Sequence, residues 1–289
     1  MSPVQIHLRR IRWALLAAGV AAAMLALTYL AVYRVGRVSR LDVSLFRSFV
    51  ALSSGHHVNR FANLAAGLCD PRTYAYLVAI PVAIALLRRR PLLALTLLAM
   101  IGGASLSTHF LKSALAAVHP GLTGAPIPAG SWPSGHSTAA TALSCAIVLA
   151  SPRRLRPYAA VLGAGFGLSV VYSVLVLGWH YPSDALGGIL MASLWAALGI
   201  AGLSAVDARR AARGKTRVQL NKPLPWVETL APPLIAGLTA LAGVATLVIV
   251  RPGATIAYIK AYHAMDLAVA LLALLSLGVA TALAAALRR

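Results

Sequence analysis

The stretch ALGGILMASLWAALGIAGLSAV, residues 185–206, contains no charged side chain and decides the class of fold. An α-helix rises about 1.5 Å per residue, so roughly 20 apolar residues cross the ~30 Å hydrocarbon core of a bilayer. Comparable apolar runs recur between charge clusters along the chain, at residues 13–33, 73–87, 92–111, 137–151, 158–179, 226–250 and 267–287. The sequence therefore predicts an all-α, polytopic helical membrane protein with eight spans.

The composition of the whole chain supports this class. Of its 289 residues, 60% are hydrophobic and only 11% are charged, whereas soluble domains carry about 25% charged residues. A water-soluble globule is therefore excluded. In a soluble protein, 26 Lys and Arg against 6 Asp and Glu would suggest a nucleic-acid partner. Here the basic residues lie between apolar runs, so we interpret them as topology signals and expect the lipid bilayer, not nucleic acid, as the partner.

The basic residues also predict the orientation of the chain in the membrane. If the N-terminus is cytoplasmic, most Lys and Arg residues fall on the inner side, in clusters at 9–12, 88–90, 153–156 and 209–222. The positive-inside rule then predicts a plasma-membrane protein with both termini on the cytoplasmic side. Residues 34–72 fall on the outer side. Their mixture of apolar and polar residues predicts an amphipathic helix or a helical hairpin in the interface.

One basic segment divides the chain into two parts. Residues 207–225 contain Pro223 and Pro225 and predict a cytoplasmic linker. It separates a six-helix core, residues 1–206, from a C-terminal transmembrane hairpin, residues 226–289.

Polar residues are costly in a membrane, so their clustering is informative. On the third span, Lys112 ends a polar helical face at the predicted outer surface. The loop that follows delivers Ser134, Gly135 and His136 to the start of the fourth span. The unpaired N–H groups and positive dipole of a helix N-terminus, together with a glycine, favour an anion there.

A third cluster joins the fifth and sixth spans. Ser173 and His180 are seven residues apart and so share a helical face, and Asp184 follows four residues after His180. The predicted topology brings all three clusters to the outer side of the membrane.

These residues resemble the motifs of the type 2 phosphatidic acid phosphatase (PAP2) superfamily. KSALAAVHP (112–120) resembles the family's first motif, PSGH (133–136) matches its second, and SVLVLGWHYPSD (173–184) resembles its third. The order and spacing agree with the family pattern, and the resemblance covers the six-helix core. It implies a metal-independent membrane acid phosphatase without a cofactor, acting on a lipid phosphate.

The chain departs from the family pattern at two positions. His119 and Val174 stand where the family has arginines that hold phosphate oxygens. Each lost charge-assisted hydrogen bond is worth about 1.5–3 kcal/mol. The candidate replacements for this positive charge are a protonated His119 and two arginines of the outer segment, Arg60 and Arg72.

The resemblance also implies a mechanism. Asp184 would orient His180 for attack on phosphorus, and His136 would protonate the leaving oxygen and then activate water. Lys112, Ser134, Ser173 and the Gly135 N–H would bind the phosphate, with His119 beside them. The acidic residues are too few and too scattered for a two-metal carboxylate site, so no metal site is expected.

Three functions stay open at this point. The first is a phosphatase or pyrophosphatase that hydrolyses a polyprenyl phosphate, a polyprenyl diphosphate or a glycerolipid phosphate at the outer membrane face. The second is a phosphotransferase that passes the phosphoryl group to an acceptor other than water. The third is a catalytically weak protein that binds or transports lipid phosphates on the same scaffold. The sequence chooses neither the lipid nor an oligomeric state.

Overall fold

The computed structural model describes residues 2–117, 119–120, 127–213 and 225–286. Within these ranges the chain forms ten α-helices and two short 3-10 turns, and contains no β-strand. Six of these helices are long and apolar enough to cross a membrane, and two shorter apolar helices lie at the predicted short spans 73–87 and 137–151. The predicted all-α polytopic membrane fold is confirmed.

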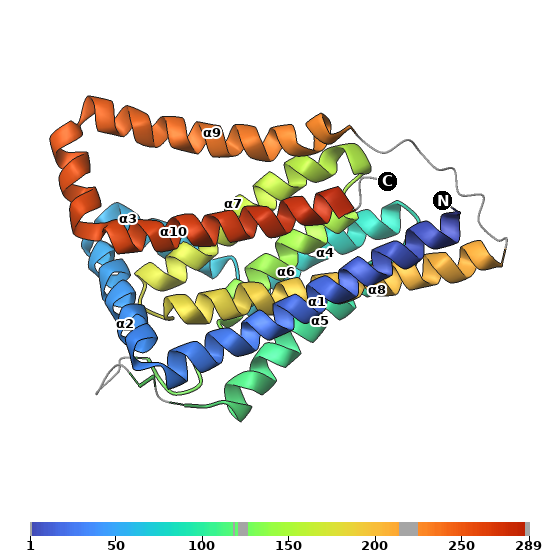
Figure 1. Cartoon of the computed structure of the whole chain (residues 1–289), viewed down its shortest axis with the longest axis horizontal. Coiled ribbons are helices and arrows are strands. Elements are labelled where there is room, and N and C mark those ends of the chain that lie inside the picture. Colours follow the sequence, from blue (N-terminus) through green and yellow to red (C-terminus); the bar gives the residue numbers. More distant parts are fainter. Residues whose placement is uncertain (1, 118, 121–126, 214–224, 287–289) are drawn as a thin grey trace.

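Eight helices correspond to the predicted spans. They are α1 (Pro3–Arg34), α4 (Pro71–Leu87), α5 (Pro91–Ala114), α6 (Gly135–Ala150), α7 (Arg156–Val176), α8 (Pro182–Ala212), α9 (Trp226–Val250) and α10 (Pro252–Ala286). Successive members run in alternate directions (Figure 1). As a result, α1 begins and α10 ends at one end of the bundle, here called the terminal end. The helices α6 and α8 begin at the opposite end, here called the far end.

The predicted outer segment forms two helices, α2 (Gly36–Ala51) and α3 (His56–Gly67), joined by the short turn η1 (Leu52–Ser54). The helix α2 lies at the far end of the bundle and contacts α7, α8 and α10 (Figure 1). Its inward face is buried at helical spacing, through Ser39, Asp42, Val43, Phe46 and Phe49. The helix α2 therefore packs onto the far end of the bundle through its buried face.

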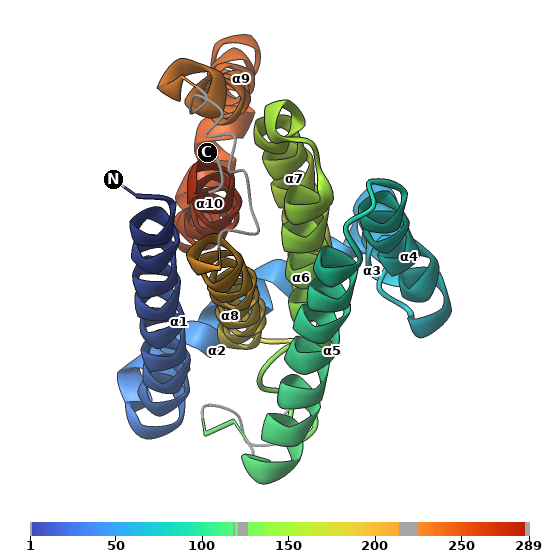
Figure 2. The same cartoon turned by 90° about the vertical axis from the view of Figure 1, so that its right-hand side faces the viewer.

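The helix α8 occupies the centre of the bundle. Seen nearly end-on, it lies between α1, α10, α6 and α5 (Figure 2), and it packs most extensively against α1, α6 and α5. Prolines stand in the first turns of α4, α5, α7 and α8. Proline suits the first turn because its fixed φ is helical and its missing N–H would have no partner there. These prolines set where each span begins.

The helix α10 differs from its prediction. It begins at Pro252, not near residue 267, and Tyr262 has non-helical dihedrals of φ −124° and ψ 18° inside it. Its first part runs along the far end and the rest returns through the bundle (Figure 1). The polar Lys260, His263 and Asp266 obscured this first part in the sequence, because a helix at the end of a bundle needs no continuous apolar run.

The two C-terminal helices are buried to different extents. In α10, Met265 and Leu272 join a buried cluster with Phe49 and Ile189, whereas most large side chains of α9 are exposed. The predicted linker 207–225 lies outside the described residues from 214 to 224.

The contact between α6 and α8 depends on Gly188. A Cβ atom placed there would lie 2.6 Å from the Ser134 carbonyl oxygen and 2.8 Å from the Thr138 backbone nitrogen. These are backbone atoms, so they cannot move aside without shifting α6. Only glycine therefore allows the two helices to approach this closely.

We predict that Gly188→Ala lowers the free energy of unfolding by about 1–3 kcal/mol, the usual cost of overpacking. The matched control is Gly202→Ala in the same helix, where a Cβ would meet no atom within 4 Å. Thermal unfolding of both purified variants in detergent measures the difference. Equal midpoints for the two variants would contradict the close contact.

Candidate active site

The turn between α7 and α8 places His180. The helix α7 ends at Val176, and Gly178, two residues further on, has a φ of 70° that is readily adopted only by glycine. The Gly178 N–H donates to the Leu175 carbonyl (3.1 Å), and the Trp179 N–H donates to the Val174 carbonyl (3.0 Å). This pair of bonds is a Schellman motif, which ends a helix and reverses the chain. The backbone then delivers His180 directly before α8.

Asp184, in the first turn of α8, holds His180. Its fully buried carboxylate accepts a hydrogen bond from the Tyr181 N–H (3.0 Å) and lies 3.2 Å from His180 Nδ1. Because a carboxylate accepts, Nδ1 carries the ring proton and Nε2 keeps its lone pair. Nε2 makes no hydrogen bond to any residue within the described ranges. The geometry thus leaves one basic nitrogen of His180 available.

The PSGH segment lies beside this turn. Ser134 is the N-cap of α6 and accepts hydrogen bonds from the Ser137 N–H (3.3 Å) and hydroxyl (3.1 Å). The Ser134 N–H donates to the Asp184 carbonyl (2.8 Å), which links α6 to α8. A Cβ on Gly135 would meet no atom within 4 Å. The N-terminus of α6 therefore opens onto free space.

The two histidines meet at the far end. The ring centroid of His136 lies 6.5 Å from that of His180 and 5.4 Å from that of Trp179. A tetrahedral group placed between rings at this spacing can contact both, because reacting atoms lie about 3–3.5 Å apart. The structure thus brings together the two histidines that the sequence analysis singled out.

Lys112 approaches from α5. It is half-buried near the end of that helix and interacts electrostatically with Asp184 and His136. One turn earlier, the hydroxyls of Thr108 and Thr138 lie 3.1 Å apart and tie α5 to α6. This buried hydrogen bond fixes the helical face that carries Lys112.

The predicted ligand on α7, Ser173, and the neighbouring Val174 are both buried. Ser173 is 0% exposed, and its hydroxyl donates to the Ser169 carbonyl at 2.7 Å. Val174 is also 0% exposed. The Ser173 proton is thus used within the helix, and a hydrogen bond to phosphate requires the hydroxyl to rotate. Its role as a ligand stays a prediction.

The two arginines of the outer segment lie on the surface. Arg60 is on α3 and Arg72 is in the first turn of α4, and both are exposed. Neither forms an ion pair or hydrogen bond with another residue in the part of the chain that the structure describes. Their contribution of charge to the site stays a prediction. In the same ranges, no three His, Cys, Asp or Glu side chains form a group that could hold a metal ion.

His119 belongs to a second His–Asp pair. Its Nε2 lies 3.1 Å from Asp42 Oδ2, and both side chains are buried. Asp42 also accepts from the Ser183 N–H (3.0 Å) and hydroxyl (2.6 Å). The His119 ring stacks on Tyr181 with centroids 4.2 Å apart. Asp42 of α2 thus caps the same first turn of α8 that carries Asp184.

The sequence analysis missed Asp42 and Ser183. Asp42 lies in the outer segment and belongs to none of the three motifs. The signal that identifies it is its place on the apolar face of α2, one helical turn from Phe46. An acid on a buried face needs a buried partner, because an unpaired charge there is costly.

One comparison with known proteins identifies a family. Residues 92–206 match the model of the PAP2 superfamily. Neither the curated proteins nor the solved structures include a significant match to the chain. The matched segment runs from α5 into α8, so it contains Lys112, the PSGH segment and the turn that holds His180.

We predict that Asp42→Ala lowers the free energy of unfolding by about 2–4 kcal/mol. The change leaves the Ser183 N–H without its acceptor in a buried environment and removes the contact of the His119 ring with a carboxylate. Asp70→Ala is the control, because Asp70 is exposed and its side chain makes no cap hydrogen bond to α4; a change below about 1 kcal/mol is expected there. Chemical unfolding followed by intrinsic fluorescence measures both. An Asp42 variant as stable as the Asp70 variant would contradict the capping role.

Proposed function

Residues 92–206 belong to the PAP2 superfamily, and from this membership we propose that the chain is a membrane phosphatase that hydrolyses a lipid phosphate through a phosphohistidine at His180. The single observation that carries the proposal is the His180–Asp184 pair, with Nδ1 and Oδ2 3.2 Å apart, facing His136 at one end of an apolar bundle. The family membership and the apolar helices support a membrane phosphatase in general. The substrate and the steps below are our proposal.

His180 is the proposed nucleophile. Asp184 accepts a hydrogen bond from the Nδ1–H group and stabilises the positive charge that develops on the ring, so that Nε2 can attack phosphorus in line. The Nε2–P bond forms as the bond from phosphorus to the leaving oxygen breaks. The burial of Asp184 strengthens its interaction with the ring, because water does not screen it.

Charge on the transferred phosphoryl group is met by fixed donors. Lys112 provides an ammonium, and the α6 N-terminus provides the Gly135 N–H and the positive end of the helix dipole. Phosphoryl transfer is catalysed mostly by positioning and electrostatic stabilisation, and donors of this type provide both. No step in this scheme uses a metal.

His119 has a positioning role in this proposal. The His119 Nε2 atom lies 3.1 Å from Asp42 Oδ2, and the ring stacks on Tyr181, so the side chain packs against the start of α8. We therefore propose that the His119 ring pairs with Asp42 and does not bind the phosphate. The absent family arginines then reduce the positive charge around the substrate to that of Lys112 and the α6 N-terminus.

His136 is the proposed acid and base. It protonates the leaving oxygen as the Nε2–P bond forms, and it then takes a proton from the water that attacks the phosphohistidine. The second step breaks the N–P bond and releases inorganic phosphate and a free His180. Its half-buried position and its distance from the His180 ring fit both steps.

The substrate is proposed to be an amphiphile. A site at the end of a bundle of membrane-spanning helices lies near the depth of lipid headgroups. Polyprenyl phosphates or diphosphates and glycerolipid phosphates fit this placement, because their tails stay in the bilayer while the phosphate reaches the far end.

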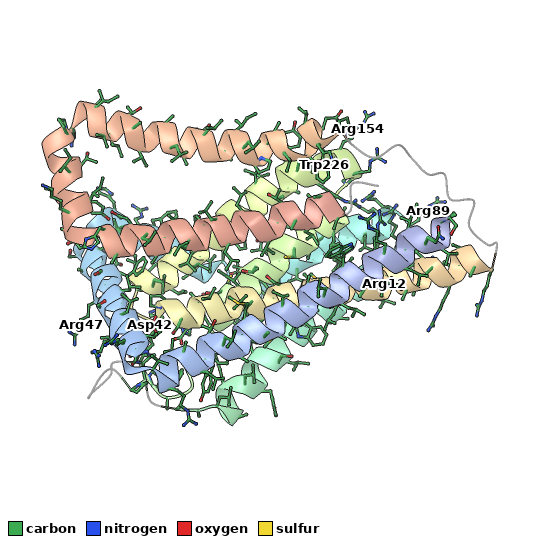
Figure 3. The ribbon with its side chains drawn as sticks, viewed as in Figure 1. Arg12, Asp42, Arg47, Arg89, Arg154 and Trp226 are labelled. Atoms are coloured by element: carbon green, nitrogen blue, oxygen red, sulfur yellow. The ribbon has the colours of Figure 1, made fainter. Side chains whose placement is uncertain are left out.

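The charge distribution supports an outer location for the far end. Arg12, Arg89 and Arg154 lie at the terminal end, whereas Arg47 and Asp42 lie at the far end (Figure 3). By the positive-inside rule, the terminal end faces the cytoplasm of a plasma membrane. The site then faces the periplasmic or extracellular side.

We predict that the purified protein releases phosphate from lipid phosphates in EDTA and that His180→Ala lowers the rate by about 10³-fold or more, since removal of a nucleophile abolishes the covalent route. A panel of polyprenyl diphosphate, polyprenyl phosphate and phosphatidate identifies the substrate. His56→Ala, an exposed histidine on α3, is the control and keeps full activity.

The same assay separates the other two functions. Product that grows with an added acceptor alcohol, without free phosphate, indicates a phosphotransferase. Binding of the lipid phosphates with no turnover in the wild type indicates a binding or transport protein and overturns the proposal.

We further predict that His136→Ala accumulates a phosphohistidine when it is given an activated ester such as p-nitrophenyl phosphate. The good leaving group needs no acid, so the first step proceeds, but hydrolysis of the intermediate lacks its base. Rapid quenching at alkaline pH followed by mass spectrometry locates the label. No label on residue 180, or the same label in a His136→Ala/His180→Ala double variant, argues against the covalent mechanism.

A further inference from the structure

A cavity reaches from the terminal end towards the middle of the bundle, and it is separate from the candidate active site. It has a volume of about 770 Å³ and is lined by α1, α8 and α10, with Trp226 at the start of α9. None of the residues assigned to the active site lines it. Its volume falls in the range of small-molecule pockets, about 300–1,000 Å³.

The cavity is an elongated apolar slot along α1. Its lining follows α1 from Ile6 to Met24, a distance of about 27 Å at 1.5 Å per residue. Small side chains such as Ala197 of α8 and Ala282 of α10 keep the slot open. It is longer than one leaflet is deep, about 15 Å of hydrocarbon, so a whole acyl chain fits along it.

The slot opens towards the surroundings of the bundle. Ala17, Val20 and Met24 line it and are exposed. In the end-on view, α1 and α10 lie on neighbouring sides of α8 (Figure 2). For a membrane-spanning bundle, this exposed apolar side faces the lipid, and a tail can enter sideways.

One end of the slot is cationic. Arg9 and Arg10 line it together with Trp13 and Trp226, and none of the described residues in its lining is acidic. Arg9 is exposed, and an adjoining surface hollow is lined by Arg9 and Arg12. Tryptophans mark the depth of the headgroups, and arginines at that depth attract anionic lipids. Apolar walls with guanidinium groups at one end are complementary to an anionic amphiphile.

We propose that this slot is a binding site for an anionic glycerophospholipid of the leaflet at the terminal end. The lipid phosphate lies by Arg9 and Arg10, and one acyl tail runs along α1 over Ala197 of α8. The site is separate from the candidate active site and does not depend on the proposed phosphatase activity.

The test uses the full-length protein and two lipids with identical acyl chains, phosphatidylglycerol and phosphatidylcholine. Native mass spectrometry measures the apparent affinity of each lipid. Each arginine at the surface is worth about a fivefold preference for an anionic lipid, so R9Q/R10Q lowers the preference for phosphatidylglycerol by tenfold or more. The control R209Q/R210Q removes two exposed arginines of the same end that do not line the slot, and it keeps the preference.

A second pair of variants tests the path of the tail. Ala17→Phe fills the exposed wall of the slot and weakens binding of both lipids, whereas Ala22→Phe, exposed on α1 outside the lining, leaves binding unchanged. Both sites are exposed, so folding is expected to persist, and thermal unfolding without lipid checks this.

Three results overturn the proposal. The first is equal affinity of the wild type for the two lipids. The second is an equal loss of preference in R9Q/R10Q and R209Q/R210Q, which would indicate a diffuse basic surface. The third is unchanged binding in Ala17→Phe.

Discussion

The buried carboxylate of Asp184 is the constraint on which the arrangement of the far end depends. It accepts the Tyr181 N–H, which would otherwise be an unpaired donor at the start of α8, and it holds the Nδ1 side of His180. The carbonyl of the same residue accepts the Ser134 N–H and so fixes the start of α6. A single residue thus caps α8, orients His180 and fixes the start of α6.

Two His–Asp pairs flank this helical turn, and their surroundings differ. The side chain of His180 is 9% exposed, while that of His119 is 2% exposed and is covered by the Tyr181 ring. His180 is the one side chain that hydrogen-bonds to the Asp184 carboxylate within the described residues, whereas the Asp42 carboxylate contacts the side chains of both His119 and Ser183. The first pair therefore leaves a ring nitrogen for chemistry. The second pair joins α2 to the first turn of α8 through the contacts of Asp42 with Ser183.

Much of the fold was predictable because the bilayer imposes a length on each span. The predicted run 226–250 matches α9 at both ends, and the short runs 73–87 and 137–151 correspond to α4 and α6. The start of α10 was not predictable, because polar residues at the end of a bundle interrupt the apolar pattern without ending the helix.

The candidate site divides in the same way. His136, His180 and Asp184 were identifiable because their spacing is local and the motifs are compact. The partner of His119 was not, because Asp42 is 77 residues away in the chain and only the packing of α2 brings it near. The hydroxyl of Ser173 was also misleading, since a bond to its own helix competes with any ligand and leaves no trace in the sequence.

The absence of a side chain at Gly188 lets the first turn of α6 lie directly against α8. This contact and the bond from the Ser134 N–H to the Asp184 carbonyl hold together the two helix starts beside which His136 and His180 lie. The gap between the His136 and His180 rings, whose centroids lie 6.5 Å apart, then accommodates one tetrahedral phosphorus centre. In the proposed reaction, the phosphoryl group of each candidate lipid would fit this gap equally well, so discrimination among substrates would fall to the groups attached to it.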